Sequence, residues 1–214
     1  MRLFILGATG RTGTELVDQG LARGHAVTAF VRSPQKIVRL QERLTVIEGD
    51  PRDASQLRAA LPGHDAVLSA LGGPDRPRFL GLGSNGSGPT TICGDCAHST
   101  VRAMQETGVR RLMVVSTAFL FTDFLLGTIV GNLFFRDTVG DAREMERTVG
   151  ASDLAWTIVR PPQLKTGGRT ERYRVNDGHL PLWGFSILRA DLAHFMLQEV
   201  EDSRHLRAIV GVSR

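Results

Sequence analysis

Short apolar runs alternate with longer amphipathic stretches along most of the chain. Each run is five or six residues long, which suits a strand, and each is largely apolar without a polar alternation. Such runs are typical of strands buried on both faces of a parallel sheet. They cover residues 2–6, 26–31, 44–48, 66–70, 111–115 and 154–159. The alternation predicts an α/β fold of the Rossmann type, with an open, doubly wound parallel sheet.

The stretches between these runs carry helix start and stop signals, such as capping polar residues and terminal glycines. We expect helices over residues 10–22, 53–61, 91–108, 141–149 and 189–200, the third capped by Thr90 or Thr91, and a short helix from Pro34. A last strand is expected near 208–212, and a short extended pair near 173–175 and 185–188. No linker or repeat divides the chain, so we predict one domain over residues 1–214. It would include an apolar insertion, partly helical, at 118–140 and a small C-terminal substrate-side region at 163–188.

A glycine-rich segment, Gly7-Ala8-Thr9-Gly10-Arg11-Thr12-Gly13, follows the first expected strand and opens the first expected helix. In this context the first glycine permits a tight turn, the second lets the backbone approach a pyrophosphate, and the third allows close helix–sheet packing. Free N–H groups and the helix dipole then favour the phosphates. We therefore predict that the chain binds NAD(P) through Gly7, Thr9, Gly10, Arg11, Thr12 and Gly13.

The end of the second strand distinguishes the two nicotinamide cofactors. NAD-binding folds usually carry an acidic residue there, whereas this chain has Arg32, with Lys36 four residues on. A charge-assisted hydrogen bond to the 2′-phosphate contributes roughly 1.5–3 kcal/mol, or about ten- to a hundredfold in affinity. We predict a preference for NADP(H). The alternative is that Arg32 is one more surface arginine in a chain with few lysines.

Other cofactor contacts are expected at the remaining strand ends, because ligands bind outside the carboxyl ends of parallel strands. Asp50 would lie near the adenine, although it could equally well only cap the next turn. Leu71 and Gly72 would lie beside the phosphates and ribose, and Pro162 would also contact the cofactor. The pair Ser116-Thr117 would lie near the nicotinamide, as the candidate catalytic residues.

Composition narrows the function classes. The formal charge is +4, but the arginines are scattered, so no nucleic-acid surface is predicted. We expect no signal peptide, no transmembrane segment and a cytoplasmic location; the apolar stretch 124–135 is too short to span a bilayer. Cys93 and Cys96 are interpreted as small, half-buried side chains on one helix face, because redox or zinc chemistry would need further partners. The scattered histidines predict no metal site.

These residues resemble the atypical short-chain dehydrogenase/reductases, and among them the NADPH-dependent flavin reductase and biliverdin-IX-beta reductase group. The matching pieces run in order along nearly the whole chain: 7–13, 31–32, 49–50, 89–91, 116–120, 160–163 and 191–197. Two departures stand out. The usual Tyr-x-x-x-Lys pair is missing, since the single tyrosine is Tyr173 and position 177 is Asp. A histidine of the group is replaced by Gln163, which weakens the transfer of biliverdin reduction.

The resemblance implies an NADPH-dependent reductase that passes hydride to a flat, conjugated acceptor such as a flavin or quinone. Thr117 and Ser116 would orient the nicotinamide or the acceptor, and Phe119 and Gln163 would contact the substrate. The aromatic residues from Phe119 onward suit ordinary packing equally well. A non-enzymatic NADP(H) sensor or regulatory protein of the same fold is the alternative, because a fold does not fix a function. A sugar-nucleotide epimerase is disfavoured by the missing Tyr-Lys pair, and the chain is expected to be a monomer or a homodimer.

Overall fold

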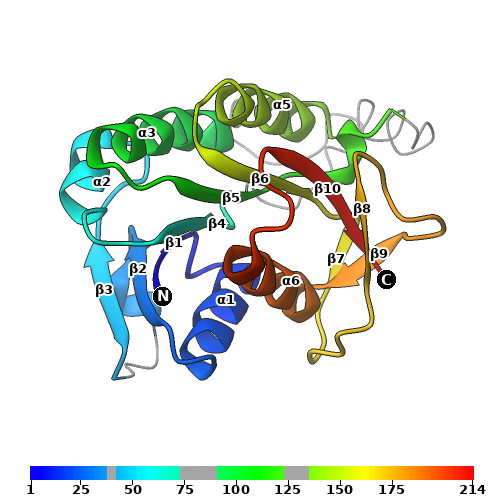
Figure 1. The fold of residues 1–214 in the computed structure, drawn as a ribbon, viewed down its shortest axis with the longest axis horizontal. Coiled ribbons are helices and arrows are strands. Elements are labelled where there is room, and N and C mark those ends of the chain that lie inside the picture. Colours follow the sequence, from blue (N-terminus) through cyan, green and yellow to red (C-terminus); the bar gives the residue numbers. More distant parts are fainter. Residues whose placement is uncertain (38–41, 73–90, 123–134) are drawn as a thin grey trace, which may run out of the picture.

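The expected apolar runs form the strands of one mixed but mainly parallel sheet (Figure 1). The computed structural model describes residues 1–37, 42–72, 91–122 and 135–214. Within these residues the order across the eight-stranded sheet is β3-β2-β1-β4-β5-β6-β10-β8, and only β8 runs antiparallel to its neighbour. The strands are β1 (Arg2–Leu6), β2 (Ala26–Val31), β3 (Leu44–Glu48), β4 (Ala66–Ser69), β5 (Arg111–Val115), β6 (Ala155–Arg160), β8 (Arg174–Asp177) and β10 (Ala208–Ser213).

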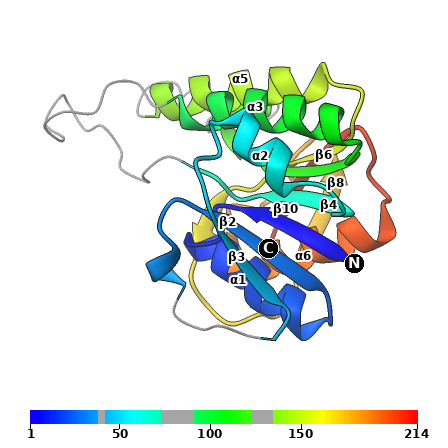
Figure 2. The same cartoon turned by 90° about the vertical axis from the view of Figure 1, so that its left-hand side faces the viewer.

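Helices cover both faces of this sheet, which confirms the doubly wound α/β fold. In Figures 1 and 2 the helices α1 and α6 lie on one face, and α2, α3 and α5 lie on the other. Their bounds are α1 (Arg11–Ala22), α2 (Ala54–Ala60), α3 (Ile92–Thr107), α5 (Arg136–Gly150) and α6 (Arg189–Asp202), with 3-10 turns η1 (Pro34–Lys36) and η2 (Ala118–Leu120).

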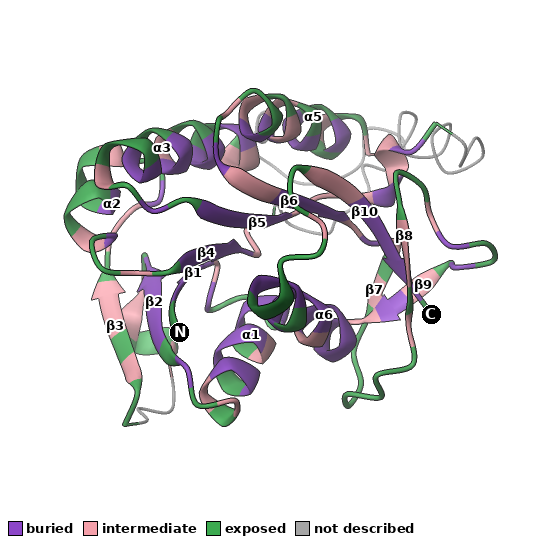
Figure 3. Cartoon of the chain, in the orientation of Figure 1, coloured by how far each residue is buried: buried purple, intermediate pink, exposed green. Residues whose placement is uncertain are grey.

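Alternation along the strands divides the core into two layers. On β1, Leu3 and Ile5 pack in the cluster that includes residues of α1 and α6, while Phe4 and Leu6 pack in the cluster with α3 and α5. All four side chains are buried, as expected where successive strand residues face opposite sides. Figure 3 shows the buried strands between partly exposed helices. The continuous apolar runs in the sequence follow directly from this burial on both faces.

Most expected boundaries agree with the structure. Asp53 caps α2, because its carboxylate accepts hydrogen bonds from the N–H groups of Ser55 and Gln56. Thr91 is the N-cap residue of α3, but its hydroxyl donates to the Asp95 carboxylate (2.7 Å) instead of capping the backbone; Thr90 lies outside the described residues. The helix expected over 141–149 begins earlier, at Arg136, within the predicted apolar insertion. Residues 123–134 of that insertion lie outside the described part.

The expected pairing near 173–175 and 185–188 is wrong. The first segment, β8, pairs with β10 at the sheet edge. The second, β9 (Ser186–Leu188), pairs in parallel with β7 (Gln163–Lys165) in a separate two-stranded sheet. Neighbours along the chain are therefore not neighbours in the sheet here, and three-residue strands give no periodicity from which β7 could be predicted. The result is a small substructure directly after the carboxyl end of β6.

Candidate cofactor-binding site

The glycine loop joins β1 to α1 and is packed without room for side chains at two positions. Gly7 has φ +77°, and a Cβ there would lie 2.8 Å from the carbonyl oxygen of Ala70. A Cβ on Gly13 would overlap the carbonyl of Gly7. The loop closes through a 2.9 Å hydrogen bond from Gly10 N to Gly7 O. Glycine is therefore required by the backbone conformation at Gly7 and by close packing at Gly13.

This loop has the features of a phosphate cradle. Gly10 is the N-cap residue of α1, and having no side chain it makes no side-chain cap to the first amides. Those amides and the helix dipole favour an anion. Thr9, Gly10 and Arg11 are exposed and Thr12 is buried behind them. The order β2-β1-β4-β5 reverses direction between β1 and β4, which is the switch point where open α/β sheets bind nucleotides. The residues present thus fit a dinucleotide pyrophosphate.

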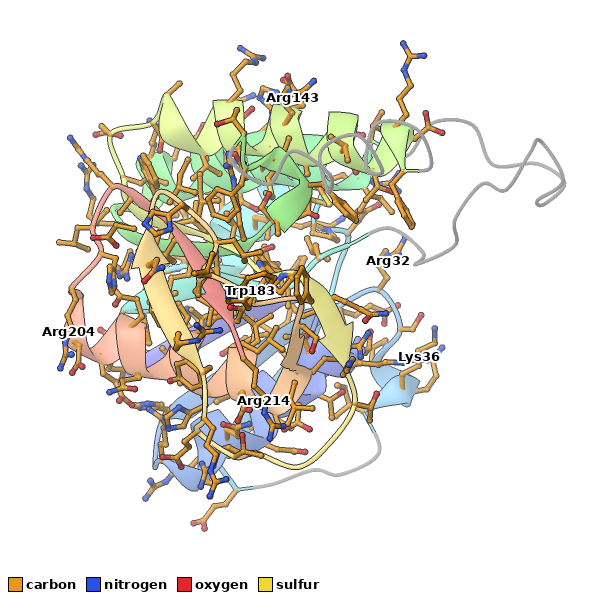
Figure 4. The ribbon with its side chains drawn as sticks, turned by 90° about the vertical axis from the view of Figure 1, so that its right-hand side faces the viewer. Arg32, Lys36, Arg143, Trp183, Arg204 and Arg214 are labelled. Carbon is orange, nitrogen blue, oxygen red and sulfur yellow. The ribbon has the colours of Figure 1, made fainter. Side chains whose placement is uncertain are left out.

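Two cations lie at the end of β2. Arg32 follows β2 directly, and Lys36 ends the η1 turn. Both side chains are exposed and reach the same edge of the molecule, the right-hand side of Figure 4. This edge holds the carboxyl ends of the parallel strands. Their contact with the 2′-phosphate of a cofactor stays a prediction.

Asp50 lies near these cations but is engaged by a different arginine. Hydrogen bonds from the Arg52 side chain and backbone, the shortest 2.6 Å, lower the pKa of Asp50 to about 2, and Arg32 adds a smaller effect. Its carboxylate also accepts from the Arg52 N–H (3.0 Å), so Asp50 does shape the turn that follows β3. The turn-capping interpretation of Asp50 is thus present in the structure, and its contact with adenine stays a prediction.

Leu71 and Gly72 follow β4 at the same edge. Gly72 is exposed, and the Leu71 carbonyl accepts a contact from the Cys93 thiol (3.8 Å). Cys93 is half-buried and Cys96 is buried, on the first turns of α3, as expected for small packing residues. Burial raises the pKa of the Cys96 thiol to about 12, so this thiol is far from the thiolate form at neutral pH. That disfavours redox chemistry at the Cys93-Gly94-Asp95-Cys96 segment.

Ser116 follows β5, and its hydroxyl donates a 2.5 Å hydrogen bond to the Glu146 carboxylate. Glu146 is also held by Arg160, whose Nε and Nη2 reach its two oxygens at 2.9 and 2.6 Å. Arg160 donates to the Leu120 carbonyl (2.9 Å) and lies 4.7 Å from the centre of the Phe121 ring. Three segments after β5, on α5 and at the end of β6 are thereby tied together.

Thr117 lies beside this cluster and begins the η2 turn. Its hydroxyl oxygen accepts a hydrogen bond from Phe119 N (3.3 Å). The Phe119 ring stacks on Phe135, with centroids 5.4 Å apart. The carbonyl of Pro161, at the end of β6, accepts from Ala118 N (2.9 Å). The strand ends of β5 and β6 are thus joined directly around Thr117.

The remaining predicted substrate-side residues follow in the chain. Pro162 is half-buried, and Gln163 is exposed at the start of β7, with its N–H donating to the Phe185 carbonyl (3.3 Å). The structure thus brings Thr117 and Phe119 together and places Gln163 on the adjoining two-stranded sheet. The assigned roles of these residues toward cofactor or substrate stay predictions.

The sequence did not lead us to predict that Glu146 belongs to this cluster, or that Arg160 pairs with it. Glu146 lies 30 residues from Ser116 and 14 from Arg160 along the chain. A signal was present: Glu146 follows Met145 and precedes Val149 on the buried side of α5, where a carboxylate requires a partner. Which partner it finds depends on packing between α5 and the sheet.

Two negative observations apply to the described residues. None of their helices is long and apolar enough to cross a bilayer. No group of three or more His, Cys, Asp or Glu side chains among them is arranged to hold a metal ion.

Comparison with known proteins agrees with a nicotinamide-cofactor site at this edge of the sheet. The pattern of a family described as NAD(P)H-binding matches residues 7–203. A chloroplastic protein of Arabidopsis thaliana is 30% identical over 175 residues, covering 77% of this chain and 59% of that protein. The 3-diazoavenalumate denitrifying reductase of a Streptomyces species is 31% identical over 204 residues, covering 85% of this chain and 64% of the reductase. The chain therefore spans less than two thirds of the length of either relative.

Solved structures share the fold. A short-chain dehydrogenase/reductase from Veillonella parvula, determined in complex with NADP, superposes with a TM-score of 0.80 over all of this chain and 94% of the other, at 20% identity. At this identity the similarity establishes the common fold.

Proposed function

This chain belongs to the NAD(P)H-binding family, and from that premise we propose that it is a reductase that uses NADPH to reduce a flat, conjugated acceptor such as a flavin or a quinone. Family membership gives the nicotinamide cofactor and an oxidoreductase-like fold. The named activity of the Streptomyces relative, a reductase, supports the reaction class. The chemical class of the acceptor, a flavin or a quinone, is the more specific part of the proposal.

The observation that carries the proposal is the arrangement at the carboxyl ends of β5 and β6. When bound, the cofactor supplies the hydride, and the protein's task is to hold the two rings in position and exclude water. Thr117 offers a hydroxyl there, and the stacked rings of Phe119 and Phe135 give a flat apolar wall beside it. The Glu146 carboxylate next to Ser116 is paired with Arg160, which suits an acceptor that takes no proton from a protein acid. A flavin or quinone meets that condition, because water can protonate its reduced form.

The 2′-phosphate preference is proposed from Arg32 and Lys36. Both cations lie free of the sheet core at the edge where the adenosine ribose of a dinucleotide would lie. We also propose a cytoplasmic location and a monomeric or homodimeric state.

A non-enzymatic NADP(H)-responsive protein is the second candidate, and one observation favours it. Leu182, Trp183 and Phe185, in the segment that leads into β9, are exposed and offer apolar surface to a partner. This candidate predicts tight cofactor binding without turnover.

The test is to follow NADPH oxidation by the purified chain with FMN, riboflavin and a simple quinone, beside a titration of NADPH binding. Turnover above the uncatalysed rate with any acceptor, lowered at least tenfold in Thr117→Val, is expected for the reductase. The isosteric valine removes the hydroxyl and keeps the shape. Tight NADPH binding with no turnover on any acceptor would replace the reductase by the second candidate.

A further inference from the structure

The direction of one hydrogen bond at the strand ends is fixed by chemistry. Glu146 and Ser116 approach within 2.5 Å, and a carboxylate paired with arginine is an acceptor only. The Ser116 hydroxyl must therefore donate its single hydrogen to Glu146. What remains on the Ser116 oxygen is acceptor capacity.

The group that imposes this direction is rigid. Glu146 and Arg160 are only 9% and 13% exposed, and two nearly parallel hydrogen bonds join them. Bidentate pairs of this kind hold both side chains in one orientation. Arg160 is itself fixed by the Leu120 carbonyl and the Phe121 ring. The carboxylate thus faces Ser116 without any ligand being needed to orient it.

The neighbouring hydroxyl has the opposite polarity. Thr117 accepts from Phe119 N, which occupies a lone pair of its oxygen and leaves its hydrogen for a ligand. Two consecutive residues after β5 thereby offer one acceptor and one donor. A primary carboxamide carries the matching pair, an N–H₂ donor and a carbonyl acceptor on one carbon.

We propose that Glu146 and Arg160 are positioning residues that make Ser116 an obligate acceptor, and that Ser116 receives a hydrogen bond from the carboxamide N–H₂ of the nicotinamide ring. This inference rests on the nicotinamide cofactor of the proposed function and is independent of the acceptor and of turnover.

The test compares two oxidised cofactors that differ in one group. In the 3-acetylpyridine analogue of NADP⁺ a methyl group replaces the amide N–H₂, so the donor to Ser116 is lost and the carbonyl is kept. We expect the wild-type chain to bind NADP⁺ about three- to tenfold more tightly than the analogue, the range for one hydrogen bond. In Ser116→Ala the two dissociation constants should become equal within about twofold.

The role of Glu146 is tested by Glu146→Gln. A glutamine offers one oxygen, whereas Oε1 of Glu146 accepts from Ser116 and from Arg160 Nε, and Oε2 accepts from Arg160 Nη2. The substitution therefore breaks the bidentate pair that fixes the direction of the Ser116 hydrogen bond. The discrimination between the two cofactors should then be lost. Glu144→Gln is the matched control, because Glu144 lies on the same helix in an exposed pair with Arg147, and it should keep the wild-type ratio.

The affinity for 2′,5′-ADP, which lacks the nicotinamide half, reports folding of the adenosine subsite in every variant and should not change. If the ratio of the dissociation constants for the analogue and for NADP⁺ were unaltered in Ser116→Ala, the contact with Ser116 would be overturned. Loss of the ratio in Ser116→Ala but not in a folded Glu146→Gln would overturn the positioning role. These titrations contain no acceptor, so their result can be interpreted even if the protein turns out not to be a reductase. A wild-type chain that binds no NADP⁺ would overturn both the proposed function and this inference.

Discussion

At the residue scale, the space around the Cβ position of a glycine decides whether alanine can replace it. Gly13 has the Gly7 carbonyl where its Cβ would be, so that Gly13→Ala must move α1 or the loop. We expect a loss of about 1–3 kcal/mol in the free energy of unfolding, the usual effect of overpacking, together with loss of NADPH binding. Urea denaturation and an NADPH titration measure the two effects.

The control is Gly140→Ala. Gly140 is exposed on α5, and no described atom lies within 4 Å of the position of its Cβ. Alanine there should raise the free energy of unfolding by about 0.5–1 kcal/mol, because it restricts the unfolded chain and favours the helix. If Gly13→Ala bound NADPH as tightly as the wild type, the loop could not be the phosphate cradle.

Arg32 is the residue on which the choice of cofactor depends. Arg32→Ala should weaken NADPH binding about ten- to a hundredfold, because one charge-assisted hydrogen bond is lost, and should leave NADH binding nearly unchanged. Arg204→Ala is a suitable control, since Arg204 is an exposed arginine on the opposite side of the view in Figure 4. Titration of both cofactors checks this, and equal NADPH affinity in Arg32→Ala and the wild type would refute the assignment.

Residues that act by position along a strand could be predicted from the sequence, and residues that act by long-range contact could not. The positions of Arg32 and Thr117 directly after or close to the ends of β2 and β5 were predictable because strand ends can be located from apolar runs. The contact of Glu146 was not, because its partner depends on how α5 packs on β5 and β6.

At the element scale, the loop between β7 and β8 is held by a buried carboxylate at the start of α6. Asp191 is fully buried and accepts hydrogen bonds from Thr170 N (2.6 Å), Thr170 Oγ1 (2.7 Å) and Glu171 N (2.9 Å). Glu171 has φ +59°, a strained conformation that these contacts help to hold. The loop from β7 to β8 therefore depends on Asp191 for its path.

Asp191→Asn tests this anchor. Asparagine has one acceptor oxygen, so one loop N–H or hydroxyl is left without its partner, and we expect a loss of about 1–3 kcal/mol at pH 7. Asp202→Asn is the control, an exposed carboxylate at the other end of the same helix. Equal stability of the two variants in urea would show that the loop is held by other contacts.

The pH dependence of this effect has a definite sign. Burial acts to raise the pKa of Asp191, but hydrogen bonds from Thr170 and Glu171 outweigh it, and the pKa lies below its ordinary value. A carboxyl whose pKa is lowered by folding stabilises the native state above its ordinary pKa, and this contribution is lost as the pH falls through the folded value. The wild type should therefore lose part of its advantage over Asp191→Asn below about pH 4.

The element boundaries show the same division between local and non-local information. The cap at Asp53 was predictable because capping is a local hydrogen bond. The partners of β8 and β9 were not, because β8 joins the sheet edge formed by β10, more than 30 residues further along the chain. Tertiary pairing, and not strand propensity, decides where these short segments lie.

At the scale of the whole molecule, the candidate site is assembled from the carboxyl ends of β1, β2, β4, β5 and β6 on both sides of the switch point. Because parallel strands bring these ends to one edge, the sequence could predict the location of the site without any contact information. The adenosine-side residues, including Arg32, lie on one side of β1, and Thr117 lies on the other.

A ligand that spans the switch point should stabilise both sides of the sheet together. At a hundred times its dissociation constant a ligand contributes about 2.7 kcal/mol, which corresponds to roughly 5–11 °C in Tm for a chain of this size. At equal concentration NADP⁺ should give a larger shift than 2′,5′-ADP, because only NADP⁺ reaches the ends of β5 and β6, and the unfolding transition should stay single. Differential scanning calorimetry measures both quantities. Equal shifts for the two ligands would mean that the half of the site around Thr117 adds nothing to binding, and that the cofactor is held by the glycine loop and Arg32 alone.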